Sequence, residues 1–333
     1  MLLATATLLA GVVAITPFSR TYADTTPNAE GLELSPAIIN LNADPGKVYT
    51  ATINVMNTTS SRLSFTTSTD DFGSKDETGT PSIILDGDGS SPTSIKNWVD
   101  TIPAFTLAPH EKEPITVVVT VPPNAEAGGH YGVVRFSGTP TDANGSTLGL
   151  VASAGTLFLV RVSGHINENL QLTTFSTASR DDKEGSFFES GPLKFVERFT
   201  NTGNVHVQPV GQIEIHDTFG NHVATIPIND TKGNVLPGGV RRFEQDFNKY
   251  WLFGHYTADL SVGYGTQGEA IVRTIGFWVI PYKLLLVTLL ILIVIIYILT
   301  RLIKRYNKFI ISRAKQHDEK TNNKKTTKKK RKS

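Results

Sequence analysis

The sequence predicts an all-β fold of two β-sandwiches, followed by one transmembrane α-helix and a disordered basic tail. Polar and apolar residues alternate in short runs, and turn residues separate these runs about every ten positions, as in sandwich proteins. Helical blocks rich in Leu, Ala, Glu and Lys are absent from residues 24–282. Residues 284–299 are almost wholly apolar, which a soluble helix does not require on every face.

The N-terminal residues 1–23 are predicted to be a secretory signal peptide. Residues 2–15 are apolar with small residues among them, and Thr21-Tyr22-Ala23 places small side chains at the last and third-last positions before a cleavage point. No Lys or Arg precedes the apolar run, so an uncleaved N-terminal anchor is the alternative. Pro17 and the short apolar span argue against that alternative.

The first sandwich is predicted at residues 24–172. Polar and apolar side chains alternate over 50–57, and a β-branched run at 114–121 is closed by Pro122 and Pro123. Residues 70–94 are rich in Asp, Gly, Ser, Thr and Pro, so we expect a long surface excursion there.

A second sandwich, at residues 191–280, repeats the plan of the first, and residues 173–190 are predicted to connect the two. The segment 199–204 resembles 55–59, and Gly254-His255-Tyr256 repeats Gly129-His130-Tyr131. A Tyr at this position can pack inward while its hydroxyl binds a neighbouring turn.

The chain contains no cysteine, which excludes disulfide frameworks, thiolate metal sites and cysteine nucleophiles. A Gly-x-Ser-x-Gly motif and an HExxH motif are also absent from the sequence. Adjacent carboxylates such as Asp70-Asp71 lie in loop-like stretches and are expected to be solvated. We therefore expect a protein that is not an enzyme and that has no cofactor.

A transmembrane helix is predicted at residues 281–303, because about 20 apolar residues span a bilayer core. After Thr300 the sequence has 14 Lys and Arg against 2 Asp and Glu, whereas residues 24–282 have 16 against 28. Basic residues beyond a span mark the cytoplasmic side. This predicts a single-pass cell-membrane protein with an extracellular ectodomain and a cytoplasmic tail at 304–333. Trp278 and Tyr282 suit the outer membrane interface.

The segments 97–99 (Asn-Trp-Val), 105–110 and 116–136 resemble a signature of bacterial surface immunoglobulin-like domains. With a signal, two sandwiches, one anchor and a Lys-rich tail, the chain resembles the WxL-interacting protein family of Gram-positive cell surfaces. This resemblance implies two immunoglobulin-like domains, of which the first associates with the cell wall and the second binds partners.

Asp86-Gly87-Asp88-Gly89 resembles part of a calcium loop, which makes Asp86 and Asp88 calcium candidates. An EF-hand needs Gly at its sixth position and Glu at its twelfth, where this chain has Ser91 and Asn97. We therefore expect a turn without a metal, with a calcium site of another kind as the alternative.

The segment 249–253 is dense in aromatic residues. Strand alternation would bury either Tyr250 and Leu252 or Trp251 and Phe253, so we expect core packing there. The alternative is an exposed binding patch of Tyr250, Trp251 and Phe253 that contacts a sugar or a protein partner.

Arg301, Lys304, Arg305 and Lys308 directly follow the apolar run and are predicted to bind the membrane surface. Basic residues at this place attract an anionic inner leaflet. Binding of the basic tail to nucleic acid would be non-specific, and no nucleic-acid partner is expected.

The leading functional hypothesis is a non-enzymatic adhesion or scaffolding protein of a bacterial surface. Its partners would be cell-wall polysaccharide or peptidoglycan, or other surface proteins. The alternative is a membrane-tethered chaperone or assembly factor that adds a strand of an exported subunit to an exposed sheet edge.

Overall fold

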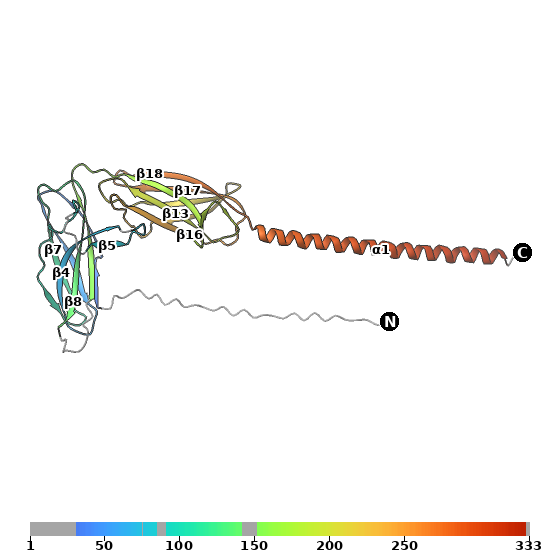
Figure 1. The fold of residues 1–333 in the computed structure, drawn as a ribbon, viewed down its shortest axis with the longest axis horizontal. Coiled ribbons are helices and arrows are strands. Elements are labelled where there is room, and N and C mark those ends of the chain that lie inside the picture. Colours follow the sequence, from blue (N-terminus) through green and yellow to red (C-terminus); the bar gives the residue numbers. More distant parts are fainter. Residues whose placement is uncertain (1–30, 75, 85–90, 142–151, 331–333) are drawn as a thin grey trace.

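The predicted fold of two immunoglobulin-like β-sandwiches with a C-terminal helix is confirmed by the computed structural model. The structure describes residues 31–74, 76–84, 91–141 and 152–330, so the predicted signal peptide at 1–23 lies outside the described residues. The two sandwiches form an L, and the helix continues from the far end of the second sandwich (Figure 1).

The first sandwich packs a small sheet, in the order β1-β3-β7, on a larger sheet, in the order β2-β9-β8-β4-β5, with β6 paired to β4. Inward residues of both sheets, such as Ile53, Phe65 and Phe136, form its core. The strands are β1 (Leu32–Ser35), β2 (Ile38–Ala43), β3 (Val48–Asn57), β4 (Leu63–Ser74), β5 (Pro81–Ile84), β6 (Phe105–Leu107), β7 (Lys112–Thr120), β8 (Gly128–Pro140) and β9 (Ala152–Val162).

The second sandwich packs the sheet β11-β10-β13-β16 on the sheet β12-β18-β17-β14-β15. Phe195, Phe199 and Phe277 are fully buried in its core. The strands are β10 (Leu170–Ser179), β11 (Glu184–Gly185), β12 (Phe187–Phe188), β13 (Leu193–Asn201), β14 (Val210–Asp217), β15 (His222–Ile228), β16 (Val240–Phe247), β17 (Gly254–Tyr264) and β18 (Glu269–Val279).

The predicted connection at 173–190 is wrong, because these residues belong to the second sandwich. β10 pairs with β13 over its whole length, and Leu170 is part of the second core. The Ser and Thr residues at 173–179 belong to β10, and the charged residues at 180–183 form the tight turn between β10 and β11. Polar residues are common in such turns.

A buried Asn ends the corresponding strand in each sandwich and confirms the internal repeat. Asn57 Nδ2 donates to the carbonyl of Leu107 at 3.3 Å, and Asn201 Nδ2 donates to the carbonyl of Val235 at 2.8 Å. Each amide also donates to a carbonyl four residues later, at 2.7 and 2.8 Å. The same side chain therefore fixes its own turn to a second loop in both sandwiches.

The helix α1 (Tyr282–Lys330) begins three residues after β18 ends. Its part Tyr282–Ile311 is long and apolar enough to cross a membrane by length and composition, and its apolar side chains are exposed. The expected disorder of residues 304–333 is wrong as far as Lys330, because the helix continues to that residue. The segment 301–330 contains no Gly or Pro and many Lys and Arg residues, which favours a helix.

Candidate functional site

The two sandwiches are joined on the outer face of the larger sheet of the first one. The Gly129 amide donates to the carbonyl of Asn204 at 2.7 Å, and the His206 amide donates to Tyr131 Oη at 2.9 Å. Gly128 allows this approach, because a Cβ atom there would lie 2.6 Å from the Asn204 oxygen. Burial lowers the pKa of His206 to about 4, so its imidazole is neutral at the interface near pH 7.

A second connection comes from the turn between β4 and β5, which reaches the second sandwich (Figure 1). The Arg242 amide on β16 donates to the carbonyl of Glu77 at 2.6 Å, and Arg198 Nε donates to the Glu77 carboxylate at 2.9 Å. The predicted surface excursion at 70–94 is thus partly wrong, because it contains the end of β4 and all of β5. Its tip holds the two domains together.

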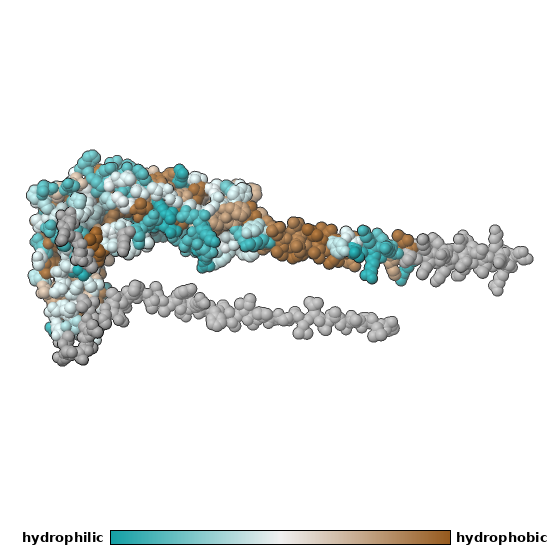
Figure 2. Space-filling view, in the orientation of Figure 1, coloured by the Kyte–Doolittle hydropathy of each residue, from teal (hydrophilic) through white to brown (hydrophobic). Residues whose placement is uncertain are grey.

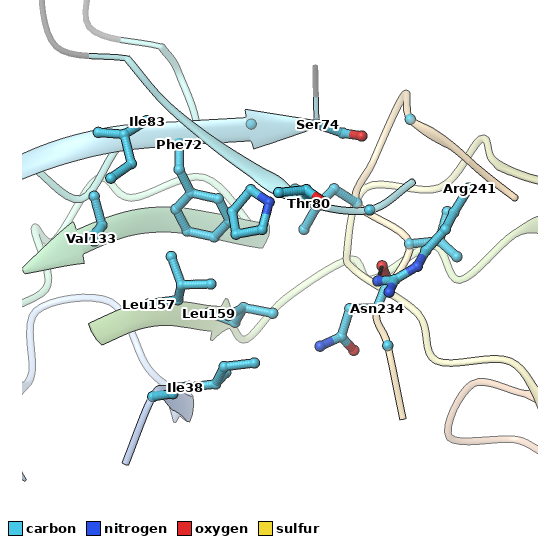
Figure 3. Close-up of a pocket in the computed structure, with 18 of the residues that line it drawn as sticks. Ile38, Phe72, Ser74, Thr80, Ile83, Val133, Leu157, Leu159, Asn234 and Arg241 are labelled. Atoms are coloured by element: carbon cyan, nitrogen blue, oxygen red, sulfur yellow. Dashed lines mark hydrogen bonds between the residues drawn. The ribbon is translucent and has the colours of Figure 1, made fainter. Parts of the chain in front are cut away.

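Residues of both sandwiches enclose an apolar cleft of about 500 Å³. Apolar side chains from five strands of the larger sheet line one wall: Ile38, Phe72, Ile83, Val133, Leu157 and Leu159. The segment 231–241 of the second sandwich forms the opposite wall. Figure 3 shows Val133, Leu157 and Leu159 directed toward Phe72, with Asn234 and Arg241 across from them.

Strand alternation explains how these side chains reach the cleft. Val134, Phe158 and Val160 point into the first core, so their neighbours Val133 and Leu159 face the opposite side of the sheet. There they form a separate apolar cluster with Phe72 and Tyr131. The larger sheet is therefore apolar on both faces where the second sandwich covers it.

The charged side chains that line the cleft are Lys232 and Arg241, and among the described lining residues there is no Asp, Glu or His. Arg241 Nη1 donates to the carbonyl of Asn234 at 2.8 Å, and its guanidinium lies 5.2 Å from the ring centre of Phe243. Arg241 Nε is buried without a partner in the described structure, and burial lowers the Arg241 pKa. The cleft thus combines apolar walls with positive charge, which suits binding more than proton transfer.

None of the predicted site residues that the structure describes lines this cleft. Asp86 and Asp88 are outside the described residues, and no group of three His, Cys, Asp or Glu that could hold a metal occurs in the described part of the chain. Arg301, Lys304, Arg305 and Lys308 are exposed on α1, and their binding to a membrane surface stays a prediction.

The expected core packing of the aromatic segment 249–253 is wrong, because neither of the two predicted pairs is buried. Tyr250, Trp251 and Phe253 are exposed, and only Leu252 is buried. These residues lie in the loop between β16 and β17, where the period-two alternation of a strand does not apply.

Sequence reasoning missed the cleft, although one signal pointed to it. Residues 157–160 form an uninterrupted apolar run, and such runs indicate strands that are covered on both faces. What covers the second face was not visible from the sequence, because the covering segment 231–241 lies more than 70 positions later.

Comparison with protein-family models and with curated proteins finds no match. Solved structures are similar in fold. The class 5 fimbriae chaperone CfaA is 13% identical with a TM-score of 0.37, and the match covers 73% of this chain and 98% of that one. The E. coli chaperone DraB is 11% identical with a TM-score of 0.36, covering 74% and 96%. The Salmonella enterica SafA pilin in complex with the SafB chaperone gives 14% identity and a TM-score of 0.35, covering 75% and 96%.

Proposed function

We propose that this chain is a membrane-anchored, non-enzymatic assembly factor that holds an extended segment of another exported protein in the cleft between its sandwiches. The observation that carries this proposal is the apolar surface that crosses the five strands of the larger sheet and remains open at the cleft. Monomeric soluble proteins rarely leave such surfaces uncovered unless something binds there.

The sheet edges support an extended ligand. β2 and β5 are the outer strands of the larger sheet, and Ile38 and Ile83 on these strands are 45% and 39% exposed. An added strand pairs its backbone with an outer strand and places alternate side chains against the sheet face. A segment with apolar residues at every second position would therefore bury them against Leu157 and its neighbours.

The positive wall of the cleft supports an acidic group in the same ligand. Lys232 and Arg241 supply charge without an acidic partner among the described lining residues, and a half-buried guanidinium favours a carboxylate that replaces lost water. We propose that the bound segment carries an Asp or Glu beside its apolar residues.

The apolar helix and the charge difference along the chain support the location. The helix Tyr282–Ile311 supplies a candidate span, and the basic residues after Thr300 favour a cytoplasmic tail. We propose that both sandwiches lie outside the cell, where exported subunits and surface proteins pass.

The test is photocrosslinking in cells that export the full chain. A photoreactive residue at Ile83 or Leu157 is expected to crosslink to an exported protein, and the same residue at Val48 or Val272 is the control. Val48 and Val272 are exposed apolar positions that do not line the cleft. The crosslinked segment, prepared as a peptide, should then bind the purified chain, and Ile83→Asp with Ile38→Asp should weaken that binding about tenfold or more.

Equal crosslinking at all four positions, or none at the cleft, would contradict the assembly function. Sedimentation of the ectodomain with purified cell wall, unaffected by the two Asp substitutions, would instead favour the adhesion function that the resemblance to WxL-interacting proteins implies.

A further inference from the structure

Six large aromatic side chains are exposed at one end of the second sandwich, with exposed fractions between 47% and 92%. We call this surface the aromatic end. It consists of Phe187, Phe219, Tyr250, Trp251, Phe253 and Trp278. Among the described residues of the sandwiches, exposed Trp side chains occur only at this end, since Trp98 is buried.

Strand register brings these residues together from four separate segments. Asp217 at the end of β14 pairs with Tyr256 on β17, which places the turn with Phe219 beside the start of β17. Gly254 pairs with Val279 at the end of β18. Phe187 pairs with Trp278. Because β18 ends at Val279 and α1 begins at Tyr282, the aromatic end surrounds the point where the helix leaves the domain.

Hydrogen bonds hold the aromatic loops in place. Thr218 Oγ1 donates to the carbonyl of His255 at 2.9 Å, and the Phe253 amide donates to Tyr256 Oη at 3.1 Å. Leu252 is buried between its exposed neighbours and anchors the loop in the core. The loop therefore presents Trp251 and Phe253 outward instead of folding them back.

The start of the helix is also bound to the domain. The Ile280 amide donates to the carbonyl of Phe188 at 2.9 Å, and Lys283 Nζ donates to the Glu189 carboxylate at 2.6 Å. Because the start of the helix is bound in this way, the domain stays close to the surface that the helix enters.

We infer that the aromatic end inserts into the lipid headgroup region on the side of the membrane that faces the sandwiches. Trp and Tyr favour this region because their rings are apolar and their N–H and O–H groups are polar. The apolar helix continues directly from this end, and Figure 2 shows tan and brown surface there beside the brown part of the helix. The lipid surface is thus the partner that adjoins the patch.

This inference rests on the proposed membrane anchoring and adds a consequence to it. A domain that contacts lipid through four separate segments and one helix has a fixed tilt, whereas a domain on a flexible tether does not. The cleft would then be held at one height and one direction above the membrane.

The test uses the full chain in nanodiscs of phosphatidylcholine and phosphatidylglycerol. The fluorescence of the chain minus that of Trp251→Phe isolates Trp251, which is 92% exposed in the protein alone. We expect phosphatidylcholine brominated near the headgroup to reduce this difference signal about twofold, with little quenching by iodide in solution. Strong quenching by iodide and none by brominated lipid would overturn the inference.

A charged variant supplies the second measurement. Phe219→Glu with Phe253→Glu should abolish the lipid quenching of Trp251 without lowering the unfolding temperature, because both side chains are exposed. Val210→Glu is the matched control, since Val210 is exposed at the opposite end of β14 and should change neither quantity. Retained lipid quenching in the double variant would contradict the insertion of the aromatic end into lipid.

Two further outcomes have separate meanings. If Trp251 is shielded from both quenchers at one chain per nanodisc, another surface of this chain covers the aromatic end and the inference is wrong. If the chain fails to float with the lipid at all, the membrane anchoring fails first. If the chain floats with the lipid but brominated lipid does not quench Trp251, the membrane anchoring stands and only the insertion of the aromatic end is refuted.

Discussion

The carboxyl group of Glu197 should make the second sandwich less stable as pH rises. Glu197 is fully buried on β13 between the core residues Phe195 and Phe199, and it pairs across the sheet with Phe243. Neither of its carboxyl oxygens has a hydrogen-bond partner among the residues that the structure describes. Burial therefore raises the Glu197 pKa from 4.5 to about 8.

The sign follows from proton binding in the two states. Between pH 4.5 and 8 the unfolded chain loses this proton while the folded chain keeps it, so the free energy of unfolding falls as pH rises. Each pH unit costs about 1.4 kcal/mol, which gives a loss of about 3 kcal/mol at pH 7 relative to pH 4.5. Glu197→Gln cannot ionise and should escape this loss.

The assay is urea unfolding of the full chain and of Glu197→Gln between pH 4.5 and 8. The two proteins should have similar stability near pH 4.5, and the variant should be more stable by about 3 kcal/mol at pH 7. Glu214→Gln, an outward side chain in the same sandwich, controls for the loss of a negative charge. A stability difference between the chain and Glu197→Gln that is independent of pH would refute the reasoning.

Two further predictions concern the interface and the repeated Asn. Burial lowers the His206 pKa from 6.5 to about 4, so the stability that neutral His206 gives the domain interface is complete above pH 6.5 and is lost as pH falls through 4. Small-angle scattering should therefore show the chain extending on acidification. An unchanged scattering profile in that pH range would contradict this prediction. Asn201→Ala removes two buried hydrogen bonds and one partly buried one and should destabilise the second sandwich by about 3 kcal/mol. A calorimetric loss below about 0.5 kcal/mol would refute the role of that side chain.

The two sandwiches and the apolar helix could be predicted from the sequence, because their causes are local. Alternation such as that at 50–57 specifies a strand with one buried face, and a long apolar run specifies a helix for a bilayer whatever precedes it. The repeated Asn was also visible, since Asn57 and Asn201 occupy matching places in the two similar segments.

The positions where prediction failed depended on distant residues. Residues 173–190 have the composition of a linker, yet β10 pairs with β13. Tyr250, Trp251 and Phe253 have the composition of a strand, yet they occupy a loop because the buried Leu252 anchors it. In both cases the local structure was decided by residues distant in the sequence: the paired strand β13 for β10, and the core that buries Leu252 for the loop.

Periodicity and composition act within a few residues, and they were enough to predict the class of the two domains, the apolar helix and the difference in charge on its two sides. The folded arrangement was needed to see that Val133 and Leu159 face a cleft, that Glu77 connects the domains and that the aromatic residues gather where the helix begins. These features join segments far apart in the chain, and only folding fixes which of those segments meet.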